Sequence, residues 1–151
     1  MVNGAEMARV LVVDDNVLTA LHGALASSIT SGNDTTVAIV DDDDDVGAVL
    51  QGLLELVGYN VATYRSGRQF LADAPLGHVS CLVVDQSMPD MTGLEVVAQL
   101  RAMGLTIPSL LITGCREETI GRQASDLGVM EVMDKPIETG NLLRLIARSA
   151  E

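Results

Sequence analysis

The chain of 151 residues is poor in aromatic, basic and cysteine residues. It contains no Trp, and nine Lys and Arg residues face 21 Asp and Glu residues, which gives a formal net charge of −12. Because phosphate backbones and anionic membrane surfaces attract basic proteins, this balance argues against direct binding of nucleic acid or of a membrane. Since 48% of the residues are hydrophobic, the chain can still form a packed core.

The two cysteines, Cys81 and Cys115, are too few and too far apart for a disulfide framework or a zinc site. We expect both to be ordinary buried thiols in a reducing compartment. No hydrophobic run approaches the roughly 18–20 residues that a membrane helix requires. The N-terminus lacks the basic start and apolar block of a signal peptide. The sequence therefore predicts a cytoplasmic protein.

From Val37 onward, short β-branched runs alternate with longer segments of helical period. The five expected strands are residues 37–40, 60–64, 81–85, 107–113 and 129–133. The five expected helices lie within residues 46–57, 66–71, 94–101 and 117–127, and from 142 onward. Five βα units in about 115 residues predict an α/β fold, with a doubly wound parallel sheet and helices on both of its faces. Functional sites of such sheets lie outside the carboxyl ends of the strands.

Residues 1–36 are expected to form an N-terminal arm that partly duplicates the first βα unit. Residues 10–16 (VLVVDDN) resemble residues 37–43 (VAIVDDD) at an offset of 27 residues, and a helical period follows the first copy. The alternative is a chance likeness between two buried strands. We expect residues 8–30 to pack as an accessory βα arm on the sheet edge or on a second copy of the chain. A disordered arm is the other possibility.

Polar residues stand at the ends of four of the expected strands. These are Asp41 and Asp42 after the first, Asp85 in the third, Thr113 in the fourth and Lys135 after the fifth. Three carboxylates in one crevice repel one another, and Mg²⁺, which prefers oxygen ligands, would relieve that repulsion. An acidic residue after a strand is also a common helix N-cap, which accounts for Asp43 or Asp44. It does not account for three acids, a hydroxyl and a lysine at one edge.

A metal ion, a carboxylate and a lysine together favour phosphoryl transfer. Asp85 is the candidate nucleophile, which would form an aspartyl-phosphate. Mg²⁺ would neutralise the developing charge, and Lys135 would pair with a phosphoryl oxygen as a point charge. The Thr113 hydroxyl would donate a hydrogen bond to another phosphoryl oxygen and connect it with the rest of the fold.

Four motifs together resemble the receiver domain of bacterial two-component response regulators. They are Ile39–Asp42, Leu82–Asp85 with Met88–Gly93, Ile112–Gly114, and Asp134–Pro136. The intervals also fit that family, with 43 residues from Asp42 to Asp85, 28 more to Thr113 and 22 more to Lys135. Since Asp15 lies 70 residues before Asp85, the second acidic copy is the working one. Each motif is weak alone, but four in this order are specific.

The resemblance implies a flavodoxin-like sheet of strand order 2-1-3-4-5 over a receiver domain at residues 37–151. It implies that Asp85 accepts a phosphoryl group from a histidine kinase or phosphotransfer protein, and that Thr113 and Lys135 contact that group. Four residues would hold Mg²⁺: Asp41 through water, Asp42 and Asp85 directly, and Ser87 through its backbone carbonyl. The peptide bond before Pro136 is expected to be cis.

The chain departs from the family at Val132, where receivers often have an aromatic residue whose rotation reports phosphorylation together with the threonine. We expect a signalling switch rather than an enzyme, either a stand-alone receiver or a piece of a longer regulator. Its changed surface around the fourth helix, fifth strand and fifth helix would bind a downstream protein or a second copy. The first alternative is a degenerate receiver that binds a partner without phosphorylation. Another is an aspartyl-phosphate hydrolase, although its usual second acid is replaced here by Ser87.

Overall fold

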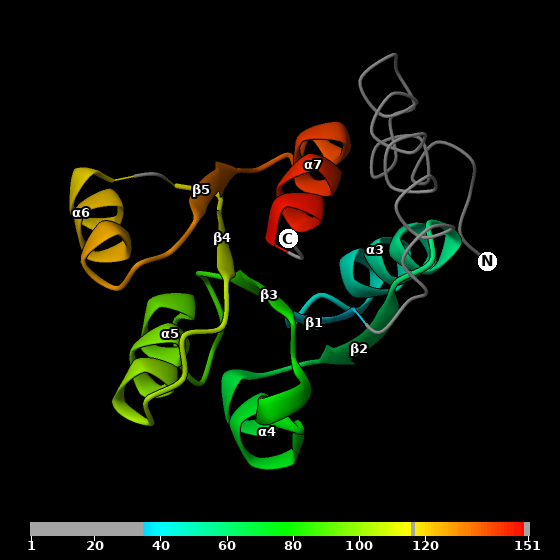
Figure 1. Ribbon diagram of the computed structural model, residues 1–151. Helices are drawn as coiled ribbons and strands as arrows, with labels where there is room; N and C mark the ends of the chain where they lie inside the picture. The colour runs from blue at the N-terminus through cyan, green and yellow to red at the C-terminus, as the bar shows by residue number, and fades with distance from the viewer. Residues whose placement is uncertain (1–34, 116, 150–151) are drawn as a thin grey trace.

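The computed structural model describes residues 35–115 and 117–149 of the chain (Figure 1). The repeat at residues 10–16 and the arm expected over residues 8–30 lie outside this part of the chain, so the arm stays a prediction. No helix in the described part combines the length and apolar character that crossing a membrane requires.

Five parallel strands form one sheet, in the order β2-β1-β3-β4-β5. The strands are β1 (Thr36–Val40), β2 (Asn60–Tyr64), β3 (Cys81–Asp85), β4 (Ser109–Thr113) and β5 (Glu131–Asp134). The order 2-1-3-4-5 and the doubly wound parallel sheet are therefore confirmed. Because all five strands run the same way, their carboxyl ends lie along one edge of the sheet.

Helices cover both faces of this sheet. They are α3 (Asp44–Leu56), α4 (Gly67–Asp73), α5 (Gly93–Ala102), α6 (Glu118–Asp126) and α7 (Thr139–Ser149), with a short 3-10 helix η1 (Leu76–His78) after α4. Figure 1 shows α3 and α7 on one side and α4 and α5 on the other, with α6 beside β5 at the end of the sheet. The core accordingly has two layers, one under α3 and α7 and one under α4, α5 and α6.

The central strands alternate their side chains between the two layers. In β1, Val37 and Ile39 pack in the layer of α3 and α7, whereas Ala38 and Val40 pack in the other. Every residue of β3 and β4 is buried. Burial on both faces explains why these strands are continuous apolar runs rather than alternating ones. The polar residues of these two strands, Asp85, Ser109 and Thr113, stand at the strand ends.

Two strands start later than the sequence pattern predicts. β4 begins at Ser109, because Pro108 has no N–H group for the ladder of hydrogen bonds. β5 begins at Glu131, because the N–H group of Val129 donates to the carbonyl of Ala124 at the end of α6, at 2.9 Å. In both cases an apolar residue before the strand packs in the core without belonging to the sheet.

Candidate functional site

The carboxyl edge of the sheet brings three acidic side chains together. One carboxylate oxygen each of Asp41, Asp42 and Asp85 lies within 4.8 Å of the other two. Asp41 and Asp85 are buried, with 8% and 3% of their surface exposed, while Asp42 is exposed. These acids meet because β1 and β3 are neighbours in the sheet. The cluster expected from the sequence is therefore present.

Burial in this cluster changes the pKa of Asp41. Burial raises the pKa of the Asp41 carboxyl to about 6, and the nearby charge of Asp85 acts in the same direction. A hydrogen bond that Asp41 accepts from the backbone N–H of Asp43, at 2.8 Å, opposes the shift. Oxygen ligands of this kind, partly buried at an open edge, fit Mg²⁺, which takes one or two carboxylates and keeps several waters.

Lys135, which follows β5, contacts Asp85 at the end of β3. Its Nζ atom lies 3.2 Å from both Oδ1 and Oδ2 of Asp85, although two strands separate the residues in sequence. Lys135 is also the only lysine of the chain. The peptide bond between Lys135 and Pro136 is cis, as the resemblance implies.

Thr113 ends β4 and is buried, but its hydroxyl is engaged within its own loop. The hydroxyl donates to the carbonyl of Cys115 at 3.1 Å and accepts from the N–H of Cys115 at 3.2 Å. Cys115 itself is exposed, so the prediction of two buried thiols is wrong for this residue. It lies two residues beyond the end of β4. Cys81 is buried as predicted, and burial raises the pKa of its thiol to about 11.

The acidic run after β1 divides between two tasks. Asp43 is the N-cap of α3 and accepts hydrogen bonds from the N–H groups of Asp45 and Val46, which confirms one of the two expected caps. Asp44 instead forms an ion pair with Arg65, with 3.0 Å between Oδ1 and Nε. Only Asp41 and Asp42 of this run belong to the acidic cluster.

The β3–α5 loop (residues 86–92) contains a residue whose role the sequence analysis missed. The carbonyl of Gln86 accepts a hydrogen bond from the N–H of Gly93, and its side-chain Oε1 accepts one from the N–H of Leu94 at 2.9 Å. Gln86 thus closes the loop and caps α5. No local pattern marks this role. Ser87, the expected carbonyl ligand, is exposed, and its N–H donates to Oδ1 of Asp85 at 3.3 Å.

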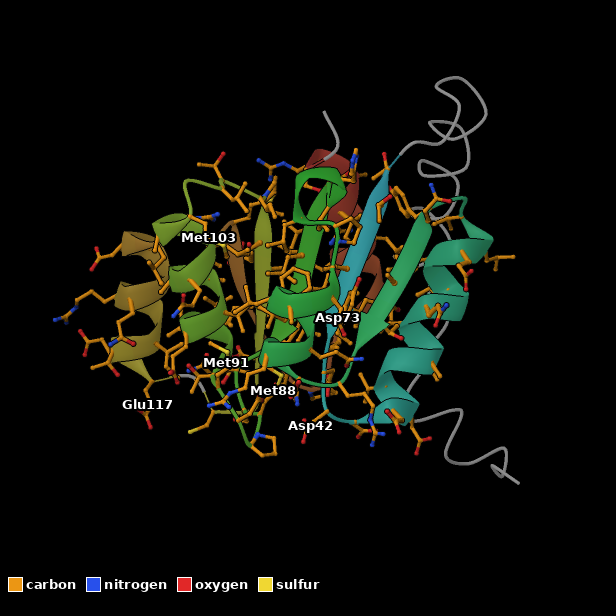
Figure 2. The ribbon with its side chains drawn as sticks, turned by 90° about the horizontal axis from the view of Figure 1, so that it is seen from below. Asp42, Asp73, Met88, Met91, Met103 and Glu117 are labelled. Atoms are coloured by element: carbon orange, nitrogen blue, oxygen red, sulfur yellow. The ribbon has the colours of Figure 1, made fainter. Side chains whose placement is uncertain are left out.

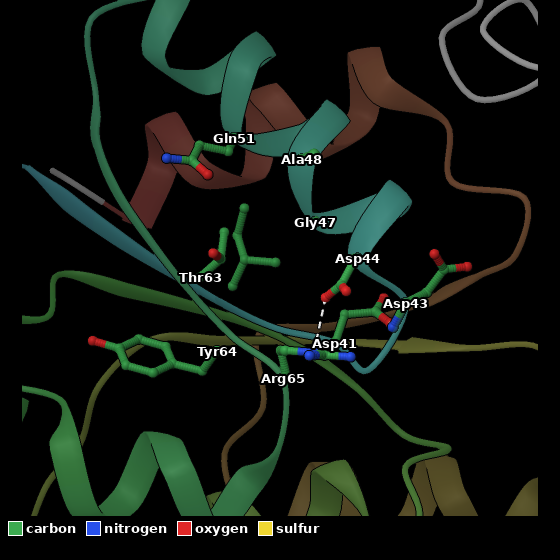
Figure 3. A pocket seen from close by; sticks show the side chains of 10 residues that line it. Asp41, Asp43, Asp44, Gly47, Ala48, Gln51, Thr63, Tyr64 and Arg65 are labelled. Atoms are coloured by element: carbon green, nitrogen blue, oxygen red, sulfur yellow. Dashed lines mark hydrogen bonds and ion pairs between the residues drawn. The ribbon is translucent and has the colours of Figure 1, made fainter. Parts of the chain in front are cut away.

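The acidic cluster lies at the carboxyl edge of the sheet, where Asp42 is exposed. A small hollow of about 90 Å³ does lie between α3 and β2, where the ion pair of Asp44 and Arg65 crosses it (Figure 3). Asp41 contributes to its wall, but Asp42 and Asp85 do not. Figure 2 shows Asp42 at the same edge of the molecule as Met88 and Met91 of the β3–α5 loop.

Comparisons with known proteins agree on one family. Residues 37–147 match the family of the response regulator receiver domain. The transcriptional regulatory protein FixJ of Rhizobium meliloti is 36% identical over 118 residues, or 78% of this chain and 58% of FixJ. The response regulator protein TodT of Pseudomonas putida is 32% identical over 112 residues, or 74% of this chain and 49% of TodT. The chain thus spans about half the length of these curated relatives.

Solved structures agree with this match. A crystal structure of FixJ-N superposes with a TM-score of 0.68 at 35% identity and covers 77% of this chain and 93% of that chain. The chemotaxis protein CheY4 of Vibrio cholerae superposes with a TM-score of 0.70 at 27% identity and covers 76% of this chain and 98% of that chain.

Proposed function

Because this chain belongs to the response regulator receiver domain family, we propose that it accepts a phosphoryl group on Asp85 and signals through protein binding. The observation that supports this most strongly is the meeting of Asp85 with two further acids and with the single lysine. A receiver belongs to signalling, and the phosphoryl donor that fits it is a histidine kinase or a phosphotransfer protein. The high negative charge still argues against direct contact with nucleic acid or a membrane. The expected location is the cytoplasm.

In the proposed step, a carboxylate oxygen of Asp85 forms a new O–P bond with the phosphoryl group of a phosphohistidine. The P–N bond of the donor breaks, its electron pair stays on the imidazole, and the imidazole takes up a proton. Lys135 holds the Asp85 carboxylate through its contacts with both oxygens and stays close to the phosphoryl oxygens after transfer. Its compact ammonium suits this role as a mobile point charge.

Mg²⁺ would be held directly by the carboxylates of Asp42 and Asp85 and by the backbone carbonyl of Ser87, and through water by Asp41. Bound there, the ion supplies positive charge that offsets the charge of the transferring group. Asp41 is oriented for this role by the N–H of Asp43, which donates to its carboxylate at 2.8 Å.

Phosphorylation would be passed on through Thr113 and α6. The Thr113 hydroxyl would give up its hydrogen bonds with the backbone of Cys115 and donate to a phosphoryl oxygen instead. This change would draw the segment that follows Thr113 toward Asp85. Val132 lines an open hollow of about 450 Å³ between α6 and β5, with Met130 and Glu131. The surface of α6, β5 and α7 would then bind a downstream protein or a second copy of the chain.

Intact-mass spectrometry after incubation with acetyl phosphate and Mg²⁺ tests this function. We expect the wild type to gain one phosphoryl group, Asp85→Ala to gain none, and Asp42→Ala to lose most of its rate together with its dependence on Mg²⁺. Glu55→Ala, which removes an exposed acid of α3 away from the edge, serves as the matched control and should behave as the wild type.

Two other outcomes would contradict this function. If the wild type gains no phosphoryl group, the chain is a degenerate receiver that acts without phosphorylation. If phosphate is released continuously and no phosphorylated protein accumulates, the chain is a hydrolase.

A further inference from the structure

The β3–α5 loop is tied to α4, a helix that contributes no residue to the acidic cluster. Oδ2 of Asp90 accepts a hydrogen bond from the backbone N–H of Arg68 at 3.1 Å, across 22 residues of sequence. Arg68 is the second residue of α4, so its N–H group has no partner inside the helix. The N-cap Ser66 serves a different group, the N–H of Gln69, at 3.1 Å. Asp90 therefore caps a second N–H group of α4 from outside the helix.

A second, apolar contact holds the next residue of the same loop. A Cβ atom placed on Gly67 would lie 2.7 Å from Cγ of Met91 and 2.6 Å from Cγ2 of Val96. The backbone of α4 thus packs directly against Met91 of the loop and against α5. Only glycine permits so close an approach. Two consecutive loop residues, Asp90 and Met91, are therefore fixed on α4 by independent contacts.

The ends of this loop are fixed beside Asp85. At its start, the N–H of Ser87 donates to Asp85 Oδ1 at 3.3 Å. At its end, the N–H of Gly93 donates to the carbonyl of Gln86 at 3.2 Å. Ser87 is the residue at this fixed start, and only Met88 and Pro89 separate it from Asp90. A displacement of Asp90 would therefore be transmitted through this short segment to the Ser87 carbonyl.

We propose that Asp90 is a positioning residue, which together with Gly67 anchors the β3–α5 loop on α4 and so holds the Ser87 carbonyl in place for Mg²⁺. This inference rests on the proposed phosphorylation of Asp85. Asp90 acts through its hydrogen bond, not as a ligand or as a general negative charge. The pKa of Asp90 is lowered: desolvation acts to raise it, but hydrogen bonds from the backbone N–H groups of Arg68 and Met91 and the charge of Arg68 outweigh that effect.

Four variants in two matched pairs test the anchor. Asp90→Asn keeps an oxygen acceptor but loses the charge, whereas Asp90→Ala loses both. Arg68→Ala keeps the backbone N–H, whereas Arg68→Pro removes it at a position in the first helical turn, where proline is tolerated. Mg²⁺ affinity is measured by isothermal titration calorimetry, and the rate of phosphorylation from acetyl phosphate is measured against Mg²⁺ concentration by intact mass.

We expect Asp90→Ala and Arg68→Pro to weaken Mg²⁺ binding about tenfold, the lower end of the range for residues that support a metal ligand. Their half-maximal rate should need correspondingly more Mg²⁺, while the rate at saturating Mg²⁺ stays within about twofold of the wild type, because Asp85 and Lys135 are untouched. Asp90→Asn and Arg68→Ala should match the wild type. Faster amide hydrogen exchange over residues 87–93 in metal-free Asp90→Ala gives a readout independent of Mg²⁺.

Two results would overturn the anchor. One is wild-type Mg²⁺ affinity in Asp90→Ala, and the other is equal weakening in Asp90→Asn, which would mean that charge rather than the hydrogen bond matters. If Asp90→Ala does not fold, Gly67→Ala serves as the substitute test. Its added Cβ atom would displace Met91, and we expect the same loss of Mg²⁺ affinity. A wild type that binds Mg²⁺ but gains no phosphoryl group refutes the proposed function, and the calorimetry still tests the anchor.

Discussion

Two loops border Asp85 at the carboxyl edge, and the structure holds them very differently. The β3–α5 loop is closed by Gln86, anchored on α4 by Asp90, and followed by a complete capping box, in which Thr92 and Glu95 bond reciprocally. The β4–α6 loop (residues 114–117) leads to Glu117, which caps α6 without a side-chain hydrogen bond.

The helices after these loops differ in the same way. Five residues of α5 are buried: Gly93, Leu94, Val96, Val97 and Leu100. In α6 only Ala124 is buried, and an open hollow of about 450 Å³ lies between α6 and β5. At the C-terminal end of α6, the carbonyl of the C-cap residue Leu127 accepts a hydrogen bond from Nε of Arg101 at 2.8 Å. α6 is thus held best at its C-terminal end, far from Thr113.

The difference matches the two tasks of a receiver. In the proposed function, the acceptor and the metal ligands must keep their geometry before the phosphoryl group arrives, which the contacts of the β3–α5 loop favour. The part that reports phosphorylation must shift for a small free-energy change, and segments with few buried contacts do so most readily. We therefore expect the N-terminal end of α6 to move on phosphorylation while α5 stays in place.

Glycine substitution gives the largest test of this comparison. A Cβ atom on Gly93 would lie 2.7 Å from the carbonyl oxygen of Asp85 and 2.6 Å from Cδ1 of Leu111, whereas one on Gly121 of α6 would meet nothing within 4 Å. We expect Gly93→Ala to lower the free energy of unfolding by about 2–3 kcal/mol through overpacking. Gly121→Ala should raise it by about 0.5–1 kcal/mol, because alanine favours the helix.

Urea unfolding followed by circular dichroism measures both changes. Equal effects of the two alanines would show that the two sides of the edge are packed alike, contrary to the comparison.

The second test uses Asp41, because its carboxyl, at the end of β1 beside Asp85, has a raised pKa. Its pKa is raised to about 6, so the folded protein binds this proton more tightly than the unfolded chain does. The resulting stability is fully present below about pH 4 and is lost as the pH rises through about 6. Without divalent cations, we expect wild-type stability relative to Asp41→Asn to fall by roughly 1–3 kcal/mol from pH 4 to pH 7.

Urea unfolding in a chelating buffer at a series of pH values measures the effect of Asp41. Mg²⁺ should recover part of the stability at pH 7, since it binds the ionised carboxylate. A relative stability that is flat or rises with pH would contradict a raised pKa.

The smallest expected effect comes from giving α6 the cap that it lacks. Glu117 has the extended backbone of an N-cap, and aspartate is a preferred residue there. Glu117→Asp should raise the free energy of unfolding by about 0.5–1 kcal/mol without a change in charge. The control Glu118→Asp, inside the helix, should not. If both substitutions are neutral by urea unfolding, the start of α6 is already satisfied and the contrast with α5 is weaker than described.

The sequence predicted the strands well where burial on both faces makes a run continuous. β2 and β3 have the predicted limits, and β1 starts one residue earlier than expected. The pattern failed at Ile107 and Val129, which are apolar because they pack in the core and not because they belong to a strand. The strand order came from the resemblance of the motifs, since hydrophobic periodicity carries no information about which strands are neighbours.

The candidate site residues also divide into those that a local sequence pattern marks and those that it does not. Asp41, Asp42, Asp85, Thr113 and Lys135 could be named because strand ends mark the functional edge of a doubly wound sheet. The capping box of Thr92 and Glu95 is also a local pattern that a closer inspection would find. Contacts between distant segments leave no such pattern, as with Asp90 on α4 or the exposure of Cys115.

The sequence by itself determined which segments form strands and helices and which residues stand at the strand ends, because both follow from the spacing of apolar and polar side chains. The spacing alone does not place β3 between β1 and β4; the resemblance implied that order, and the tertiary structure shows that Asp85 faces two acids on one side and Lys135 on the other. The tertiary structure alone decided how deeply each of these side chains is buried. It also decided that the β3–α5 loop is anchored on α4 by Asp90. Burial, pKa and anchoring depend on groups brought together from distant parts of the chain, and local sequence does not contain those distances.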